Sequence, residues 1–202
     1  MGRWKCTLNE HVFDVIDTEA KAYWLGYLYC DGCVRKKDNR VELGPKDRDQ
    51  LVKFCAFCST NYLIRSLYPN GYLNYHVTLC GAKHLVTRLI QLGVVPRKTY
   101  NHSVPVYIPE GNLAHHFWRG CIDADGSFGL YPHAPNRKAV TIQLANKNKS
   151  LLDSFLQFIN LGRVKEMKWG WEWDFSGQHP QRALPLLRTL YQNSTIYLDR
   201  KF

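Results

Sequence analysis

The chain has 202 residues, of which 45% are hydrophobic and 13% aromatic, so it can form a packed core in one large domain or two small ones. This composition excludes a disordered chain, and no stretch is long and apolar enough to indicate a membrane-spanning helix. The formal net charge of +10 favours a polyanionic partner, nucleic acid first, although a generally basic soluble surface would give the same balance.

In chain order, the first half reads as a helix, a hairpin, a helix, a second hairpin and a third helix. Asp17 or Thr18 is the expected N-cap of the first helix, Pro69-Asn70-Gly71 is a strong turn signal, and Gly93 ends the third helix. The predicted elements are a helix over 19–30, a hairpin of 33–36 with 40–43, a helix over 48–59 capped by Asp47, a hairpin of 62–68 with 72–79, and a helix over 82–92.

A linker over 100–111 contains Pro105 and Pro109, and the same order of elements then repeats. The predicted elements are a helix over 112–125, a hairpin of 127–131 with 139–144 that has Pro132, Pro135 and Asn136 at its tip, a helix over 149–160, a hairpin of 161–168 with 171–175, a helix over 181–191 that includes Pro185, and a basic tail over 196–202. The repeat predicts an α+β fold of two pseudo-symmetric αββαββα halves, 1–104 and 105–202, that mimic a dimer within one chain.

The first helix of each half ends in Asp-Gly and has a glycine at the same internal position, Gly26 or Gly120. A helix-interior glycine costs roughly 1 kcal/mol relative to alanine, so its double occurrence indicates a packing role. Small residues recur at four-residue spacing in both helices and would let their backbones approach closely: Ala22, Gly26 and Cys30 in the first, and Gly120 and Ala124 in the second. We expect Gly126 to end the second helix in the left-handed conformation.

If the two helices cross, Asp31 and Asp125 meet at helix C-termini, which carry partial negative charge. Two adjacent carboxylates resist joint ionisation, and a divalent cation relieves the conflict. Oxygen ligands with open positions favour Mg²⁺ shared with substrate phosphates, and such ions activate water. The pattern therefore predicts Asp31 and Asp125 as metal ligands and catalytic residues in phosphodiester hydrolysis.

The stretch Trp118–Gly126 closely resembles the nine-residue motif of the LAGLIDADG homing endonucleases, and Trp24–Gly32 resembles it more loosely. The eighth-position aspartate is present in both copies. The resemblance extends over nearly the whole chain and indicates the single-chain, two-motif type. The copies differ most just before that aspartate, where the first has Tyr29 and Cys30 and the second has Asp123 and Ala124.

The resemblance implies a monomer whose two motif helices form the interface between the halves, with saddle-shaped antiparallel sheets in the DNA major groove. It also implies two or three Mg²⁺ ions shared between the motif aspartates and DNA phosphates, and a double-strand break across the minor groove that leaves short 3′ overhangs, the chemistry of intron homing. A lysine from each half commonly supports this chemistry, and Lys98 and Lys201 match by position. A lysine at either place that only contacts phosphate or solvent is the alternative.

Basic and polar residues crowd the predicted hairpins, and on a β-ribbon such side chains can read base edges or contact phosphates. A solvated sheet edge is the alternative for each of them. The alternation of Trp169, Trp171 and Trp173 predicts that this hairpin is partly core. The DNA contacts predicted on the hairpins are Arg35, Lys37, Arg40, Asn74, His76, Arg137, Lys138, Gln143, Arg163 and Lys165. The resemblance also implies a polar residue after the second strand of each half, and Lys46 and Asn146 fall near that place.

Four of the seven cysteines form two Cys-x-x-Cys pairs, Cys30 with Cys33 and Cys55 with Cys58, as in a zinc ribbon. Cys55 and Cys58 lie on the apolar face of one predicted helix and Cys30 lies within another, which favours buried thiols. The start of the chain shows no secretory signal, so we expect an intracellular protein with reduced thiols.

The leading hypothesis is a sequence-specific, Mg²⁺-dependent endonuclease that makes a double-strand break in a long DNA target. The alternative is a non-cleaving binding protein on the same fold, either an RNA maturase or a transcriptional regulator. The presence of Asp31 and Asp125 together with both lysines favours the nuclease, because a protein that only binds has no need of two adjacent carboxylates. A zinc-ribbon nucleic-acid module would depend on the cysteine pairs alone.

Overall fold

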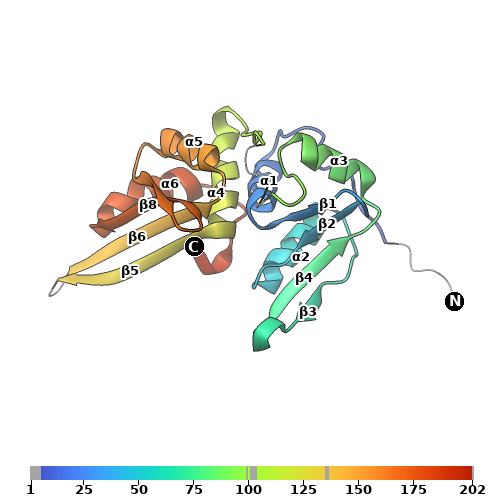
Figure 1. Ribbon diagram of the computed structural model, residues 1–202, viewed down its shortest axis with the longest axis horizontal. Coiled ribbons are helices and arrows are strands. Elements are labelled where there is room, and N and C mark those ends of the chain that lie inside the picture. Colours follow the sequence, from blue (N-terminus) through green and yellow to red (C-terminus); the bar gives the residue numbers. More distant parts are fainter. Residues whose placement is uncertain (1–5, 99, 101–103, 135–136, 202) are drawn as a thin grey trace.

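The computed structural model of the protein describes residues 6–98, 100, 104–134 and 137–201. It confirms the predicted α+β fold of two pseudo-symmetric halves, which meet at the central helices α1 and α4 (Figure 1). In the first half the elements are α1 (Glu19–Asp31), β1 (Cys33–Arg35), β2 (Arg40–Leu43), α2 (Arg48–Phe57), β3 (Arg65–Leu67), the 3₁₀ turn η1 (Pro69–Gly71), β4 (Asn74–Leu79) and α3 (Lys83–Gln91).

The second half repeats this order with longer strands. Its elements are the 3₁₀ turn η2 (Gly111–Leu113), α4 (Ala114–Asp125), β5 (Gly126–Ala134), β6 (Arg137–Asn146), α5 (Lys149–Ile159), β7 (Arg163–Met167), β8 (Gly170–Gln178), η3 (Pro180–Ala183), α6 (Leu184–Tyr191) and η4 (Asp199–Lys201). Pro185 is tolerated because it lies in the first turn of α6, where no intrahelical hydrogen bond is lost. Of the predicted tip of the β5–β6 hairpin, Pro135 and Asn136 lie outside the described residues.

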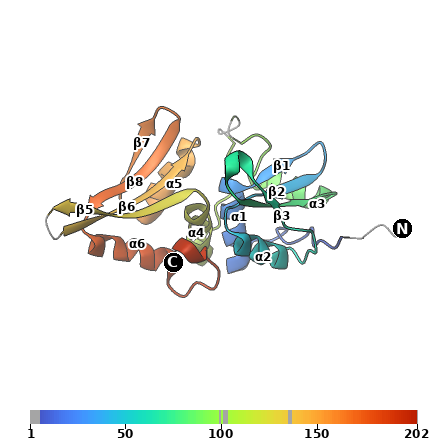
Figure 2. The same cartoon turned by 90° about the horizontal axis from the view of Figure 1, so that it is seen from below.

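The two sheets have the same topology. Both are antiparallel and four-stranded, with the orders β1-β2-β4-β3 and β5-β6-β8-β7. Figure 2 shows one sheet on each side of the central α1–α4 pair. One face of each sheet is buried, as at Val41 and Leu79, which pair directly, and at Ile142 and Phe175 in the second sheet. Residues alternate across a strand, so polar side chains such as Arg35 and Gln143 lie on the opposite faces, here called the open faces because no helix covers them.

Two sequence expectations about helix termini need correction. Asp47 stands at the N-cap position of α2 but makes no capping hydrogen bond, because its carboxylate pairs instead with Arg200 Nε at 2.7 Å. Gly126 is not left-handed. It has φ −77° and ψ 156°, and Gly32 has nearly the same extended conformation.

The structure gives another reason for these two glycines. A Cβ on Gly126 would lie 2.5 Å from the carbonyl oxygen of Ile122, and one on Gly32 would lie 2.6 Å from that of Leu28. The chain therefore leaves each helix so tightly that no side chain fits, although the backbone angles suit any residue.

The tryptophans and cysteines fall as the apolar pattern predicts. Trp173 is fully buried, Trp171 is half-buried, and Trp169 is 47% exposed. Cys30, Cys55 and Cys58 are buried free thiols, whereas Cys33 is exposed. Within the described part of the chain, the one grouping of three potential metal-ligating side chains contains no cysteine. No helix in the described part of the chain combines the length and the apolar character needed to cross a membrane.

Candidate active site

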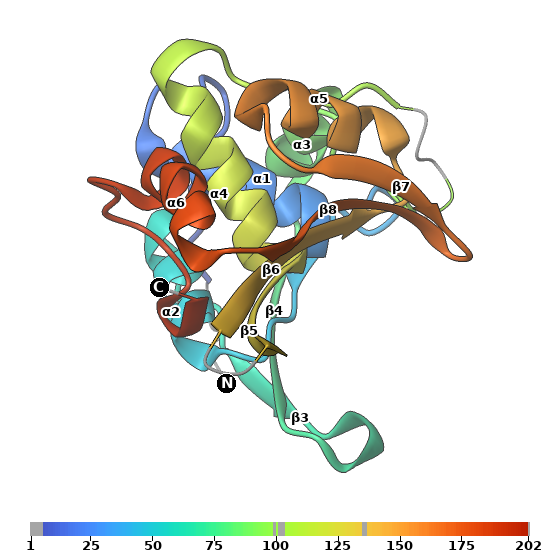
Figure 3. The same cartoon turned by 90° about the vertical axis from the view of Figure 1, so that its left-hand side faces the viewer.

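The helices α1 and α4 touch backbone to backbone (Figure 3). A Cβ on Gly26 would lie 2.0 Å from the carbonyl oxygen of Phe117, and one on Gly120 would lie 2.1 Å from that of Tyr23. Both distances are far inside van der Waals contact. The structure thus places Gly26 and Gly120 at the helix crossing, where the small-residue pattern puts them.

This crossing brings together Asp31 and Asp125, the last residues of the two helices, which we call the carboxylate pair. Both side chains reach solvent, yet the helix ends around them reduce their hydration, and this desolvation raises the pKa of both groups. The negative charge of Asp31 adds to the effect on Asp125, whose pKa rises to about 6, and a hydrogen bond joins the two carboxyl groups. Their proximity therefore disfavours two full negative charges.

A stability prediction follows from Asp125. Its pKa of about 6 lies above the ordinary value of 3.8, so the folded state holds a proton that the unfolded chain has released between these values. The free energy of unfolding of the metal-free protein should therefore fall as pH rises from about 4 to 6. We expect Asp125→Asn, measured in a chelator, to have a higher Tm than the parent at pH 7 and a similar Tm at pH 4. A difference that does not change with pH would contradict this.

The two predicted lysines lie at the ends of these helices. Lys98 Nζ donates hydrogen bonds to carbonyl oxygens at the end of α1, those of Leu28 (3.2 Å), Cys30 and Gly32 (2.7 Å). Lys201 Nζ does the same at the end of α4, with Ile122 (2.8 Å), Asp123 (2.8 Å) and Gly126. Each lysine therefore caps one motif helix and places a cation beside the carboxylate pair.

Desolvation lowers the pKa of both lysines, and that of Lys201 falls to about 8. The carboxylate pair acts in the opposite direction on both, because nearby negative charge favours the protonated amine. A larger fraction of the Lys201 amine is therefore deprotonated at physiological pH than in an ordinary lysine.

The two halves of the site differ beside the carboxylate pair. Asp123 is 0% exposed and accepts hydrogen bonds from Tyr23 Oη (2.9 Å), Tyr191 Oη (2.6 Å) and the Leu198 amide (2.7 Å). This buried carboxylate therefore braces the two halves and has no free face for a ligand. At the equivalent position in α1, the Tyr29 hydroxyl accepts a hydrogen bond from Asn148 Nδ2 at 2.8 Å and so braces the halves by different chemistry.

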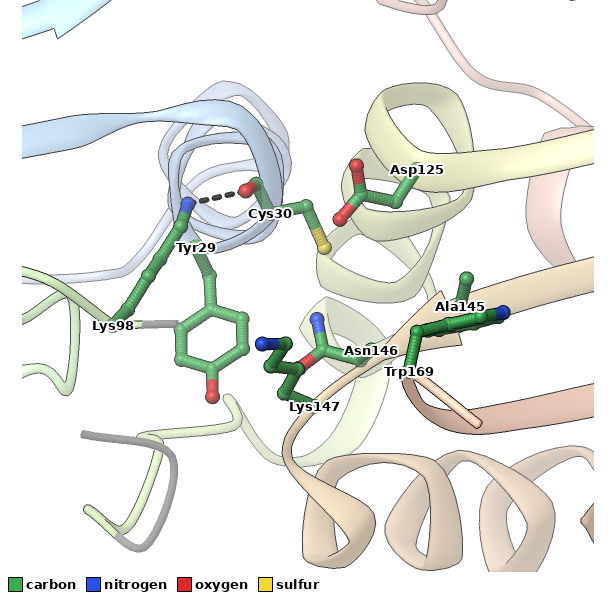
Figure 4. Close-up of a pocket in the computed structure, with 8 residues that line it drawn as sticks. All are labelled: Tyr29, Cys30, Lys98, Asp125, Ala145, Asn146, Lys147 and Trp169. Carbon is green, nitrogen blue, oxygen red and sulfur yellow. Dashed lines mark hydrogen bonds between the residues drawn. The ribbon is translucent and has the colours of Figure 1, made fainter. Parts of the chain in front are cut away.

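A pocket opens beside Asp125 on the side of the second half (Figure 4). In the close-up the Cys30 thiol points toward the Asp125 carboxylate, and the side chains of Tyr29 and Lys98 come from the other half. The predicted residue Asn146 lines this pocket. The sequence reasoning missed the adjacent Lys147 and the half-exposed Trp169. The lining residues are Tyr29, Cys30, Lys98, Asp125, Ala145, Asn146, Lys147 and Trp169.

The repeat contains a signal for Lys147. When Leu43-Gly44-Pro45-Lys46 is aligned with Leu144-Ala145-Asn146-Lys147, Lys46 corresponds to Lys147 and not to Asn146. Lys46 is exposed just after β2, and Lys147 is exposed just after β6. The two halves thus present a lysine at matching places.

The open face of the first sheet carries most of the contacts predicted for that half. Arg35 pairs with Arg40 across β1 and β2, and His76 pairs with Arg65 across β4 and β3, so these four side chains share one face. Asn74 lies on it too, two residues before His76. Lys37 is exposed in the β1–β2 turn. Arg65 was missed because the sequence of β3 alternates only weakly.

On the open face of the second sheet, two carboxylates partly neutralise the positive charge of the basic side chains. They belong to Glu172 and Asp174, which are 9% and 4% exposed. Gln143 Nε2 donates to both, at 3.0 and 3.1 Å. Lys165 Nζ lies 2.9 Å from Glu172 and Arg163 Nε lies 3.7 Å from Asp174. The predicted contacts Gln143, Arg163 and Lys165 are therefore held in a network. Lys138 is exposed near the hairpin tip, and the side chain of Arg137 lies outside the described part.

Comparison with known proteins supplies a structural likeness but no sequence match. No family model and no curated protein matches the chain. Among solved structures, the LAGLIDADG homing endonuclease I-LtrWI bound to target DNA superposes with a TM-score of 0.63 at 13% identity, covering 91% of this chain and 86% of that one. The meganuclease I-SmaMI bound to uncleaveable DNA gives 0.66 at 11% identity, covering 91% and 88%.

A further structure of I-SmaMI, bound to an uncleaved DNA target in the presence of calcium ions, gives a TM-score of 0.55 at 13% identity, covering 89% of this chain and 87% of that one. These likenesses extend over both halves of the chain. The protein therefore has the LAGLIDADG homing endonuclease fold, and the resemblance stated from its motifs is confirmed at the level of the fold.

Proposed function

We propose that this LAGLIDADG-fold protein is a sequence-specific homing endonuclease that makes a double-strand break in a long DNA target by metal-dependent phosphodiester hydrolysis. The observation that carries the proposal is the carboxylate pair, Asp31 and Asp125, held at the junction of two open sheet faces. The solved proteins of this fold named above are bound to DNA, which supports double-stranded DNA as the partner. One chain supplies both halves, so we propose that it acts as a monomer.

The donor set at the helix ends fits a hard divalent cation, and we propose Mg²⁺. Two carboxylates meet there, and the pKa of Asp125 is raised first by desolvation and then by the negative charge of Asp31, which Lys98 offsets only in part. Oxygen ligands of this kind, completed by DNA phosphates and water, suit Mg²⁺. When bound, the ion would lower the pKa of an attacking water and stabilise negative charge on the phosphate. Asp31 and Asp125 would hold it.

Lys98 and Lys201 have a second role in this proposal. Their hydrogen bonds to helix-end carbonyls fix the position of the carboxylate pair, and their charges lie where a phosphate must approach it. Fixed cations at such a place stabilise negative charge as it develops in the reaction. Lys201, with a pKa of about 8, can also exchange a proton near neutral pH.

The open sheet faces are proposed to lie against the DNA, and Arg65 gives a test that the sequence alone did not suggest. Arg65 is exposed on the same face as Arg40 and His76. We expect Arg65→Ala to weaken DNA binding and, if this side chain meets a phosphate, to reduce the slope of log affinity against log salt by about 0.9. Fluorescence anisotropy over a salt series measures it.

The control for this test is Lys83→Ala. Lys83 is an exposed lysine at the start of α3, which packs against the covered side of the first sheet. The Lys83→Ala variant loses the same charge as Arg65→Ala. An equal change in slope for both variants would therefore mean that only net charge matters.

The experiment that tests the proposed function is a cleavage selection on a randomised double-stranded DNA library with Mg²⁺. Cut products should share a long target and short 3′ overhangs, and should be absent in EDTA. The double variant Asp31→Asn with Asp125→Asn controls for contaminating nuclease. Sequence-specific binding without any cut product would instead support a non-cleaving role, as a maturase or a transcriptional regulator.

A further inference from the structure

A second group of potential metal ligands lies outside the carboxylate pair and shares no residue with it. His11, Asp14 and His84, here called the histidine cluster, place one ligand atom each within 4.8 Å of one another. His11 Nδ1 lies 2.7 Å from one carboxylate oxygen of Asp14, and His84 Nε2 lies 2.6 Å from the other. The two imidazole rings are 4.2 Å apart between centroids. Residues seventy positions apart in the chain thus converge on one point.

The backbone that carries these ligands is fixed by other contacts. Arg88, on α3, donates to the carbonyl oxygens of Phe13 (3.0 Å) and Asp14 (3.1 Å), and the Phe13 side chain is fully buried. Glu10 accepts a hydrogen bond from the His84 amide at 2.8 Å. The segment before α1 is therefore held against α3 by contacts that do not use the side chains of the three ligands. The three ligands are positioned by the fold and not only by their attraction to one another.

The chemistry of the cluster selects one class of ion. Two imidazole nitrogens and a carboxylate are typical ligands of Zn²⁺ and related transition metals, whereas Mg²⁺ and Ca²⁺ prefer all-oxygen sites. The side chains of His11, His84 and Asp14 are 68%, 47% and 40% exposed, so an ion can enter and water can complete its coordination. In each ring the second nitrogen, which is not the one that faces Asp14, can carry the proton when the first binds a metal.

We propose that the histidine cluster binds one divalent transition-metal ion, Zn²⁺ in the first place, through His11 Nδ1, Asp14 and His84 Nε2. The ion would link two parts of the first half, namely the segment that precedes α1 and the helix α3. Because α3 packs on β1 and β2, this link would stabilise the first half of the molecule. Its role is structural and independent of the Mg²⁺ proposed for cleavage.

The test uses full-length, untagged protein that carries Asp31→Asn and Asp125→Asn, so that the carboxylate pair cannot hold the ion. After chelator treatment and its removal, Zn²⁺ is titrated by calorimetry and Tm is followed by thermal unfolding. We expect one equivalent of Zn²⁺ to bind and the Tm to rise by about 5 °C at a hundredfold excess over Kd. Mg²⁺ in place of Zn²⁺ should give neither effect.

Three variants assign the site. His11→Asn and His84→Asn should each weaken Zn²⁺ binding at least about a hundredfold, since loss of a direct ligand should exceed the tenfold to hundredfold cost of losing an outer-shell partner. His179→Asn, at an exposed histidine near η3, should leave affinity and the Tm rise unchanged. His11 is so exposed that its replacement does not threaten folding. Absence of Zn²⁺ binding, or binding that persists in both His11→Asn and His84→Asn, would overturn the proposal. The cluster would then be a metal-free contact in which Asp14 accepts hydrogen bonds from two imidazoles.

Discussion

Replacement of either Asp31 or Asp125 by asparagine should abolish DNA cleavage while DNA binding persists. Asparagine keeps the shape of the side chain but removes the charge and one oxygen ligand, so the pair can no longer hold a divalent ion firmly. Loss of an ion that stabilises the transition state by roughly 4 kcal/mol corresponds to about a thousandfold lower rate. Single-turnover cleavage of a selected target, with binding measured in parallel, gives both quantities.

Asp153→Asn is the matched control for charge. Asp153 is an exposed aspartate on α5 whose nearest partner is Lys149, and its replacement should leave the cleavage rate unchanged. The unfolding transition of each variant separates inactivity from misfolding, because the Asp125 variant is expected to be at least as stable as the parent in a chelator. Cleavage at the parental rate in both Asp31→Asn and Asp125→Asn would refute the proposed catalytic role.

Gly26→Ala and Gly120→Ala should each destabilise the fold by about 3 kcal/mol or more, the upper range for an overpacked core. The added methyl group meets a backbone carbonyl at 2.0 or 2.1 Å, and a backbone carbonyl cannot rotate away as a side chain can. The helices α1 and α4 would have to separate, and the carboxylate pair with them. For a chain of this length, 3 kcal/mol lowers Tm by roughly 6–12 °C.

Gly44→Ala provides the comparison. A Cβ on Gly44 would meet only a His76 ring carbon at 3.4 Å and a carbonyl oxygen at 3.5 Å, both ordinary contacts. Chemical denaturation should therefore show little change for Gly44→Ala and a large loss at the two crossing positions. Similar losses at all three sites would mean that the helix crossing is not the reason for the effect.

The features that could be predicted are those with local signals. The Asp-Gly endings and the turn at Pro69 act within a few residues, so the order of helices and hairpins in both halves follows from them. The packing role of the internal glycines, which contact the other helix, could be predicted only because the motif occurs twice. At Gly126 the sequence correctly indicated that a glycine is needed to end the helix, but the expected left-handed conformation was wrong. The left-handed angle is a property of one residue, whereas the close passage of the chain past Ile122 depends on the direction it takes afterwards.

The features that were missed depend on chain segments far apart in sequence. Asp47 has a typical capping position, but its partner Arg200 arrives from the C-terminal tail, and Lys53 likewise pairs with Asp199 at 2.8 Å. Nothing in the neighbourhood of Asp47 indicates that contact. Arg65 could not be assigned to a face until the register with His76 was known.

The unequal lengths of the two sheets give the molecule a direction along its proposed target. The longest described strand of the first sheet, β4, has six residues, and β6 in the second sheet has ten. At about 3.3 Å per residue they span roughly 20 and 33 Å, and a base-pair step of B-DNA is about 3.4 Å. If the proposed duplex lies along these strands, it meets about six base pairs on one side of the cut and about ten on the other. We would then expect an asymmetric target with one short and one long arm.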